Sequence, residues 1–426
     1  MDNFCYLSLY IALWIISFIV YKKNSPSFGA SLGGYFIVYY GISACAALWM
    51  SQQVFYTQSA LYRYDIPSFL PLFYLFVVLL LFATPLFLFR IDCKNKVVLV
   101  GDTSNFSCFH GRIFVILCAI FCFVSVVVVI TVLPKILSLD AITSVDAGTL
   151  DKRAFQQENN SIIFSSKFST YSYLLWKMLK DIMICFSFFL YCREKNKLAL
   201  LLIIFSCILP ILWGLANANR QQALCTMISI GVTFLIFKSA LPRKTAKKFI
   251  LSVSIVVPVL FLAIILISFA RFGDYSSFLI YELVRYFGES PLNFSSMLFE
   301  HQQAMLWGAS SFPMFLDISL DERLVLIRHS VGIVSYIFYG FVGNFVMDFG
   351  KILTVLAGLF VLLVSLMRKH NNQIKNRLTI GDAIFIQFWA NLCFQGLFFF
   401  TYLLDLYALV ASLFISLLFK VKVSRI

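Results

Sequence analysis

The run Ile113–Leu133, IFVILCAIFCFVSVVVVITVL, decides the fold class of this chain. It carries no charged residue and follows directly on Arg112. A membrane-spanning helix needs about 20 predominantly apolar residues, so this run is long enough to cross a bilayer. Runs of the same kind recur along most of the chain, and they predict these eleven spans: 4–21, 29–49, 68–89, 112–133, 171–192, 197–215, 222–238, 249–270, 351–367, 380–400 and 402–419.

The composition agrees with these spans. Hydrophobic residues make up 61% of the 426 residues and charged residues 13%, with a mean hydropathy of +0.89. Soluble domains carry about 45–50% apolar and about 25% charged residues, so a water-soluble protein is excluded. We therefore expect an all-α polytopic membrane protein, with 1–426 as a single integral membrane domain and the first run retained as a span.

The basic residues predict the topology. Cytoplasmic loops collect Lys and Arg, and most of the 34 basic residues fall in six short segments at 22–23, 90–112, 193–197, 238–248, 368–377 and 420–425. With all six inside, the N-terminus lies outside and the C-terminus is cytoplasmic. An even number of crossings must then separate 238–248 from 368–377. Segment 330–347 is accordingly predicted to be re-entrant or to lie at the outer surface, and twelve full crossings with one basic loop outside remain the alternative.

The lengths and motifs of the loops limit the classes of function that the chain can have. The long loops, 134–170 and 271–329, fall outside, and we expect the second to be a large periplasmic loop with short amphipathic helices. The inner loops hold no GxxxxGK[ST], GxGxxG or DxD motif, which disfavours ATP-driven transport and nucleotide-sugar chemistry. The eleven Cys lie in spans or inner loops without metal-ligand spacing, so we expect no metal and no cofactor. Although the net charge is +14, the basic residues are not concentrated in a domain with aromatic residues between them, which argues against nucleic-acid binding.

Several arginines stand near the predicted outer face. Arg220 falls in the first turn of a span that Asn219 can cap, where free N–H groups favour an anion. It is either part of a phosphate site or an interfacial residue that reaches lipid phosphates. Arg271 ends the eighth span, where a cation suits the helix dipole. Arg285 shares a helical face with Glu282, as an ion pair or as a grip on an anionic group.

Further polar candidates follow in the large loop. The stretch Gly288–Asn293 is expected to break the helix, after which Phe294, Leu298, His301 and Met305 recur at helical spacing. His301 thus falls on an apolar stripe, as a packing residue or a general base, and His329 is the second histidine candidate. Asn344 and Asp348 are four apart on one face at membrane depth. In the fifth span, Lys177 and Asp181 can pair as i and i+4.

These features together resemble the Wzy-type O-antigen and capsular oligosaccharide repeat-unit polymerases. The resemblance rests on the large late outer loop, on Arg220 before a span, on the stretch from Arg285-Tyr-Phe-Gly288 to Asn293, and on Gly340-Phe-Val-Gly-Asn-Phe-Val-Met-Asp-Phe-Gly350. The Gly-Ser-Arg-Gly often present at the first arginine of such enzymes reads Ala218-Asn-Arg-Gln221 in this chain.

The resemblance implies a membrane glycosyltransferase at the outer face of the bacterial inner membrane. Its substrates would be oligosaccharides linked to undecaprenyl pyrophosphate, joined without a metal, and a chain-length regulator would be its protein partner. Positive charge on the leaving pyrophosphate and a base for the acceptor hydroxyl are required. The candidate bases are His301, Glu289 and Asp348, and the candidate binding residues are Arg220, Arg271, Arg285, Asn293, His329 and Asn344. A flippase of the same lipid-linked unit and an O-antigen ligase are the alternatives.

Overall fold

The regular elements of the chain are helices. The computed structural model describes residues 2–24, 31–52, 66–89, 108–138, 166–193, 197–216, 220–238, 241, 244, 246–247, 250–251, 276–309, 325–326, 339–375, 379–397 and 403–419. These residues contain no strand, which confirms the all-α class. The elements are α1 Asp2–Asn24, α2 Leu32–Ser51, α4 Leu70–Phe82, α5 Thr84–Leu88, α6 Cys108–Ser138, α9 Lys167–Arg193, α10 Lys197–Ile203, η3 Ile204–Ile208, α11 Leu209–Ala216, α12 Arg220–Phe237, α14 Ser276–Asn293, η4 Phe294–Leu298, α16 Gly340–Lys375, α17 Ile380–Gln395 and α18 Leu403–Leu418.

The helices follow the predicted apolar runs. Every run contains helix, although of 249–270 the structure describes only 250–251, both helical. Four stretches within the described residues are long and apolar enough to cross a membrane: Asn3–Asn24, Leu32–Ser51, Gly111–Pro134 and Gly340–His370. Shorter apolar helices cover Leu70–Phe82, Lys197–Leu212 and Leu224–Phe237. The number of eleven crossings stays a prediction.

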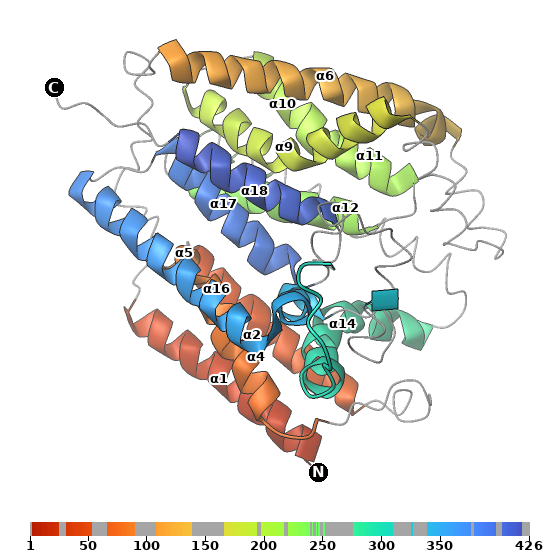
Figure 1. Cartoon of the computed structure of the whole chain (residues 1–426), viewed down its shortest axis with the longest axis vertical. Coiled ribbons are helices and arrows are strands. Elements are labelled where there is room, and N and C mark those ends of the chain that lie inside the picture. Colours follow the sequence, from red (N-terminus) through yellow and green to blue (C-terminus); the bar gives the residue numbers. More distant parts are fainter. Residues whose placement is uncertain are drawn as a thin grey trace. The chain divides into compact units, whose positions relative to one another are not determined.

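The chain divides into two compact units (Figure 1). Unit 1 comprises residues 1–95, 280–376 and 389–406, and unit 2 comprises 96–279, 377–388 and 407–426. The core of unit 1 is aromatic, because Trp14 stacks on Tyr40 at 5.5 Å and meets Phe76 edge-on at 4.9 Å. In unit 2, Phe186 packs edge-on against Phe114 and Phe419.

Two of the basic clusters lie at the same end of unit 1. The ring of Tyr21, at the end of α1, packs on Phe87 of α5. Helix α16 runs beside α4 and α5 in the same direction, since the Tyr74 hydroxyl donates to the Lys351 carbonyl at 2.6 Å and Gly358 lies against Leu81. Lys22–Lys23 and Arg368–Lys369 therefore reach the same side of this unit, as the charge argument requires of two inner loops.

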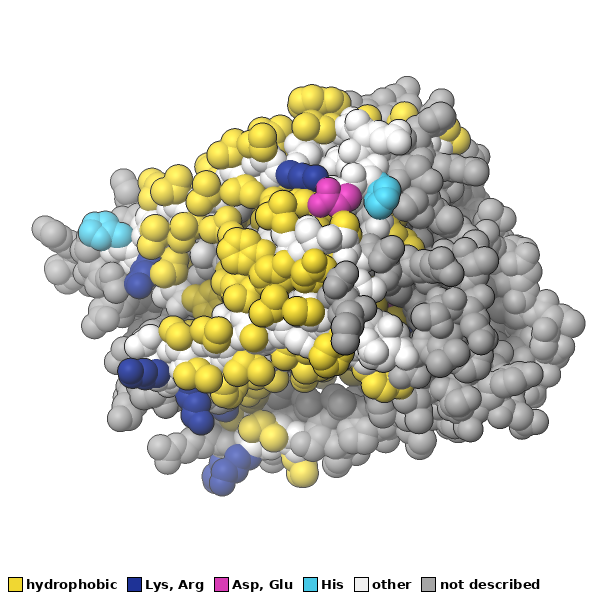
Figure 2. Space-filling view, turned by 90° about the horizontal axis from the view of Figure 1, so that it is seen from below, with side chains coloured by type: hydrophobic (Ala, Val, Ile, Leu, Met, Phe, Trp, Pro, Cys, Tyr) yellow, Lys and Arg dark blue, Asp and Glu magenta, His cyan; other side chains and the backbone are white. Residues whose placement is uncertain are grey.

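Apolar side chains cover the outside of the helices. Figure 2 shows hydrophobic side chains in a broad patch on one face; Lys and Arg side chains lie along one edge of the patch and also within it, beside an acidic side chain. On α16 the exposed residues form a long apolar stripe: Ile352, Leu353, Leu356, Leu359, Phe360, Leu363, Leu366 and Met367. Water would solvate such a stripe poorly, whereas lipid chains match it.

Candidate functional site

Helix α14 is fixed against α2 by a glycine. A Cβ atom on Gly288 would come within 2.7 Å of the backbone of Ala46 and Ala47, so the absence of a side chain lets the two helices touch. One turn further, Pro291 has no N–H to donate to the carbonyl of Phe287. The hydroxyl of Ser43 on α2 donates to that carbonyl instead, at 2.6 Å.

These contacts correct one sequence-based expectation. The stretch Gly288–Asn293 was expected to break the helix, yet α14 continues through Pro291 to Asn293 and passes into the π-helical turn η4. The expectation was wrong because the carbonyl released by Pro291 finds a donor on another helix. Ser295, whose hydroxyl donates to the Pro291 carbonyl at 2.8 Å, supplies a second local bond.

Ser43 gives a direct stability prediction. In the S43A variant the part-buried carbonyl of Phe287 loses its donor, which should cost about 1 kcal/mol. We expect a lower melting temperature for purified S43A than for S51A, since the bonds of the Ser51 hydroxyl are local: it donates to the Leu48 carbonyl and accepts from Gln52 Nε2. Equal melting temperatures for the two variants would show that the Ser43 hydrogen bond does not stabilise α14.

The anchored part of α14 carries an ion pair. Arg285 Nε donates to Glu289 Oε2 at 2.7 Å, and its Nη2 lies 3.4 Å from Glu289 Oε1. Glu289 is 2% exposed, whereas the Arg285 side chain is 35% exposed. The arginine is thus the accessible member of the pair, and the buried carboxylate orients it. The side chain of Glu282, the other acid considered for Arg285, is outside the described part of the chain.

A broken helix supplies the facing polar groups. Gly340, at φ 67°, begins α16 against Ser290 of α14, and Gly350, at φ 76° and ψ 173°, interrupts it. The half-helix between them is about 15 Å long and cannot span a bilayer by itself. It holds Asn344 and Asp348, which are 2% and 0% exposed. This agrees with a re-entrant segment, which stays a prediction because 330–338 lie beyond the described residues.

Buried polar groups thus concentrate where α14, η4 and the half-helix pack together. Gly343 of the half-helix lies against Phe294 and Leu298 of η4. The buried polar residues of these segments are Glu289, Ser290, Asn293, Ser295, Ser296, Asn344 and Asp348. Asn344 Oδ1 receives no hydrogen bond from any residue that the structure describes. A buried amide oxygen in this state costs free energy, which marks the region as a candidate ligand site.

The loop after η4 closes the broken end of the half-helix. Gln302 Nε2 donates to the Val346 carbonyl at 2.7 Å, the Leu306 N–H to Met347 at 3.0 Å, and the Trp307 N–H to Asp348 at 2.8 Å. These carbonyls belong to the last turn before Gly350. At the end of a helix the last carbonyls have no N–H donor within the helix. The loop therefore caps the half-helix and is held at its end.

The loop also changes the expected place of His301. The apolar spacing of Phe294, Leu298, His301 and Met305 predicted one continuing stripe, but the helix ends at Leu298 and His301 is exposed in a turn. That expectation was wrong because the chain leaves the helix to bond the carbonyls at 346–348. As a consequence His301 is accessible, whereas the other two candidate bases, Glu289 and Asp348, are buried.

The remaining candidates fall elsewhere. Arg220 begins α12 as predicted, in unit 2, and its side chain is not described. Arg271 and His329 lie outside the described residues. Asn293 is fully buried at the end of α14. The candidate site of unit 1 is therefore built from Arg285, Glu289, Asn293, Asn344 and Asp348, with His301 on the loop beside it.

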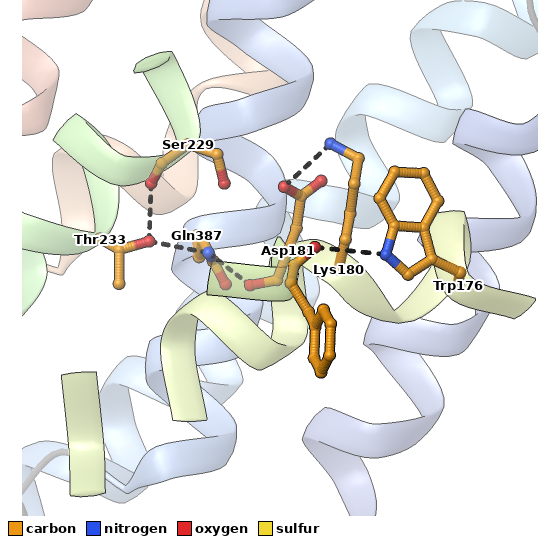
Figure 3. Close-up of polar contacts among 7 residues, drawn as sticks. Trp176, Lys180, Asp181, Ser229, Thr233 and Gln387 are labelled. Atoms are coloured by element: carbon orange, nitrogen blue, oxygen red, sulfur yellow. Dashed lines mark hydrogen bonds and ion pairs between the residues drawn. The ribbon is translucent and has the colours of Figure 1, made fainter. Parts of the chain in front are cut away.

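Unit 2 holds a separate buried polar cluster (Figure 3). Lys180 Nζ pairs with Asp181 Oδ1 at 3.3 Å, and Gln387 Nε2 donates to the Asp181 carbonyl at 2.8 Å and to Thr233 Oγ1 at 2.7 Å. Thr233 in turn donates to the Ser229 carbonyl. These bonds join α9, α12 and α17. The carboxylate of Asp181 thus pairs with Lys180, and its pairing with Lys177 stays a prediction.

The chain matches no protein-family model, and comparisons with curated proteins and with solved structures give no match either. The polymerase resemblance accordingly stays a prediction that depends on the residues described above.

Sequence reasoning missed three parts of this site. Ser43 and Gln302 act through contacts distant in sequence, and neither stands in a local pattern. Gly350 ends the Asn344–Asp348 stretch and was visible as a glycine in a helical pattern, a signal that can mark a helix end. Its positive φ of 76° explains why glycine is favoured there.

Proposed function

We propose that this protein is a membrane-embedded glycosyltransferase that joins lipid pyrophosphate-linked oligosaccharide repeat units into a polymer. The observation that supports it most is the Arg285–Glu289 pair, an accessible guanidinium aimed by a buried carboxylate at the edge of a buried polar region. A guanidinium can donate two parallel N–H hydrogen bonds to phosphate oxygens. Its positive charge stabilises the negative charge that develops on the pyrophosphate as it leaves.

The reaction needs few groups. The bond from the anomeric carbon of the growing chain to the pyrophosphate oxygen breaks, and a bond to a hydroxyl oxygen of the acceptor unit forms. The hydroxyl proton passes to a base, for which His301 is the accessible candidate. The electron pair leaves with the lipid pyrophosphate, next to Arg285. No step in this scheme calls for a metal, and we propose metal-independent transfer.

His301 gives a clean test of the base. The H301A variant should lose about 100-fold or more in transfer rate, the range expected for a general base, with little change in folding because the side chain is exposed. His370, also exposed, lies near the opposite end of α16, so H370A is the matched control and should keep wild-type activity. Wild-type chain growth in H301A at normal protein level would assign the base elsewhere.

The phenotype of a host that lacks this protein separates the proposal from its alternatives. A polymerase loss leaves surface glycan capped with one repeat unit, since export and attachment still work. Absence of surface glycan, with lipid-linked single units held on the inner leaflet, would indicate a flippase. Long chains that accumulate on the carrier lipid would indicate a ligase.

The flippase has one observation in its favour. The ion pair Lys180–Asp181 and the buried Lys177 lie in the middle of α9, and charged groups at membrane depth are common in transport pathways. The polymerase is preferred because its candidate groups lie together in unit 1.

A further inference from the structure

Trp307 is held in an unusual state. Its backbone φ is 52°, and it is the one non-glycine residue with a positive φ among those the structure describes. Its side chain is 69% exposed. A bulky residue in the left-handed region is strained by about 1–3 kcal/mol and persists where the surroundings fix it. An indole that is mostly exposed contributes little to the core, so burial of the ring gives little folding reason for that strain.

Backbone hydrogen bonds fix the main chain of Trp307 at the candidate site. The Trp307 N–H donates to the Asp348 carbonyl at 2.8 Å, and the Ala309 N–H donates to the Leu306 carbonyl at 2.9 Å. Gly308 continues the turn at φ 90°. Trp307 is thus attached to the capped end of the half-helix that carries Asn344 and Asp348. Because the backbone is already fixed, only the two side-chain torsions of the indole remain to be ordered when a ligand stacks on it.

The neighbouring side chains suit a sugar. Glu300, His301 and Gln303 are exposed on the same short loop, and they offer a carboxylate, an imidazole and an amide. A pyranose ring has an apolar C–H face that stacks on an indole and hydroxyls at its edge that bond to such groups. A bilayer surface is the other partner that exposed Trp residues favour. The carboxylate of Glu300 argues against it, because lipid phosphates repel negative charge.

We propose that the loop 300–307 is a glycan-binding surface, in which Trp307 stacks on a pyranose ring of the oligosaccharide and Glu300 and Gln303 bond to its hydroxyls. This inference rests on the proposed function for the class of glycan. In this proposal Arg285 binds the pyrophosphate and the loop 300–307 binds the sugar of the same substrate.

The test uses the full-length protein in nanodiscs and the free oligosaccharide repeat unit, released from the host carrier lipid by mild acid so that it has no pyrophosphate. Tryptophan emission is recorded for wild type and W307F, and the difference isolates Trp307 among the six tryptophans. We expect a saturable change with wild type and a loss of that change with W307F. In a second measurement, binding of the oligosaccharide to W307A should be about tenfold weaker, as for the loss of a stacking partner.

The control is W49F, since Trp49 is 39% exposed on α2, and this variant should respond as wild type does. Oligosaccharide binding that is equal in wild type and W307A would overturn the inference. So would quenching of the difference emission by brominated lipids without any response to sugar, which would make the loop a membrane anchor. Binding at Trp307 without polymer formation by the enzyme would contradict the proposed function and leave the sugar site standing.

Discussion

We expect the R285A variant to lose polymer formation by about 100-fold or more, the range for removing a donor that stabilises developing charge. Arg285 is the accessible cation of the candidate site, and Glu289 holds its guanidinium through Nε at 2.7 Å. R285K should recover little, because an ammonium cannot reproduce the fork. The measurement is the length distribution of glycan made in vivo, normalised to the amount of protein in the membrane.

A folding defect must be separated from a chemical one. R285A leaves the carboxylate of Glu289 buried without its cation, which destabilises the fold by itself. The matched variant R285A/E289Q removes both charges, so it should return to a near-wild-type melting temperature and still make no polymer. Full-length chains from R285A/E289Q would show that Arg285 takes no part in the reaction.

We expect G288A to destabilise unit 1. The new Cβ would lie 2.7 Å from the backbone of Ala46 and Ala47, and backbone atoms on α2 cannot move aside as a flexible side chain can. Overpacking of this kind costs about 1–3 kcal/mol, and it should also loosen Glu289, the next residue, and Arg285, one turn before. The measurement is thermal unfolding of the purified protein together with polymer length.

The matched control for G288A is G231A. Gly231 is also inside a helix, α12, and a Cβ there meets nothing within 4 Å. This variant should be neutral or more stable by about 0.5–1 kcal/mol, since alanine favours a helix. Equal stability of G288A and G231A would contradict the close contact of α14 with α2.

Hydropathy was sufficient to place the helices, because each apolar run must bury its backbone polar groups in helical bonds at membrane depth. It could not place their breaks. Pro291 would end most helices, but Ser43, almost 250 residues away, takes the free carbonyl of Phe287. The pairing of Arg285 with Glu289 was likewise open to Glu282, since both spacings put an acid on the same helical face.

The end of the helix before the loop 299–309 could not be predicted from the local sequence either. The spacing of Leu298, His301 and Met305 reads as one helix, and a local pattern cannot show that the carbonyls at 346–348 require donors. Gly350 interrupts α16 just after these carbonyls, and Gln302, Leu306 and Trp307 leave the helical path to bond with them. Residue types at the site were therefore predictable, whereas their accessibility depended on contacts between distant segments.

The proposed polymerase activity is tested most directly with the purified protein in liposomes that contain the host lipid pyrophosphate-linked repeat unit. We predict a ladder of longer lipid-linked chains, with one carrier lipid pyrophosphate released for each unit added, and the same ladder in the presence of EDTA. R285A/E289Q, folded to the same extent, should give none. Folded wild-type protein that releases no carrier and extends no chain would contradict the account.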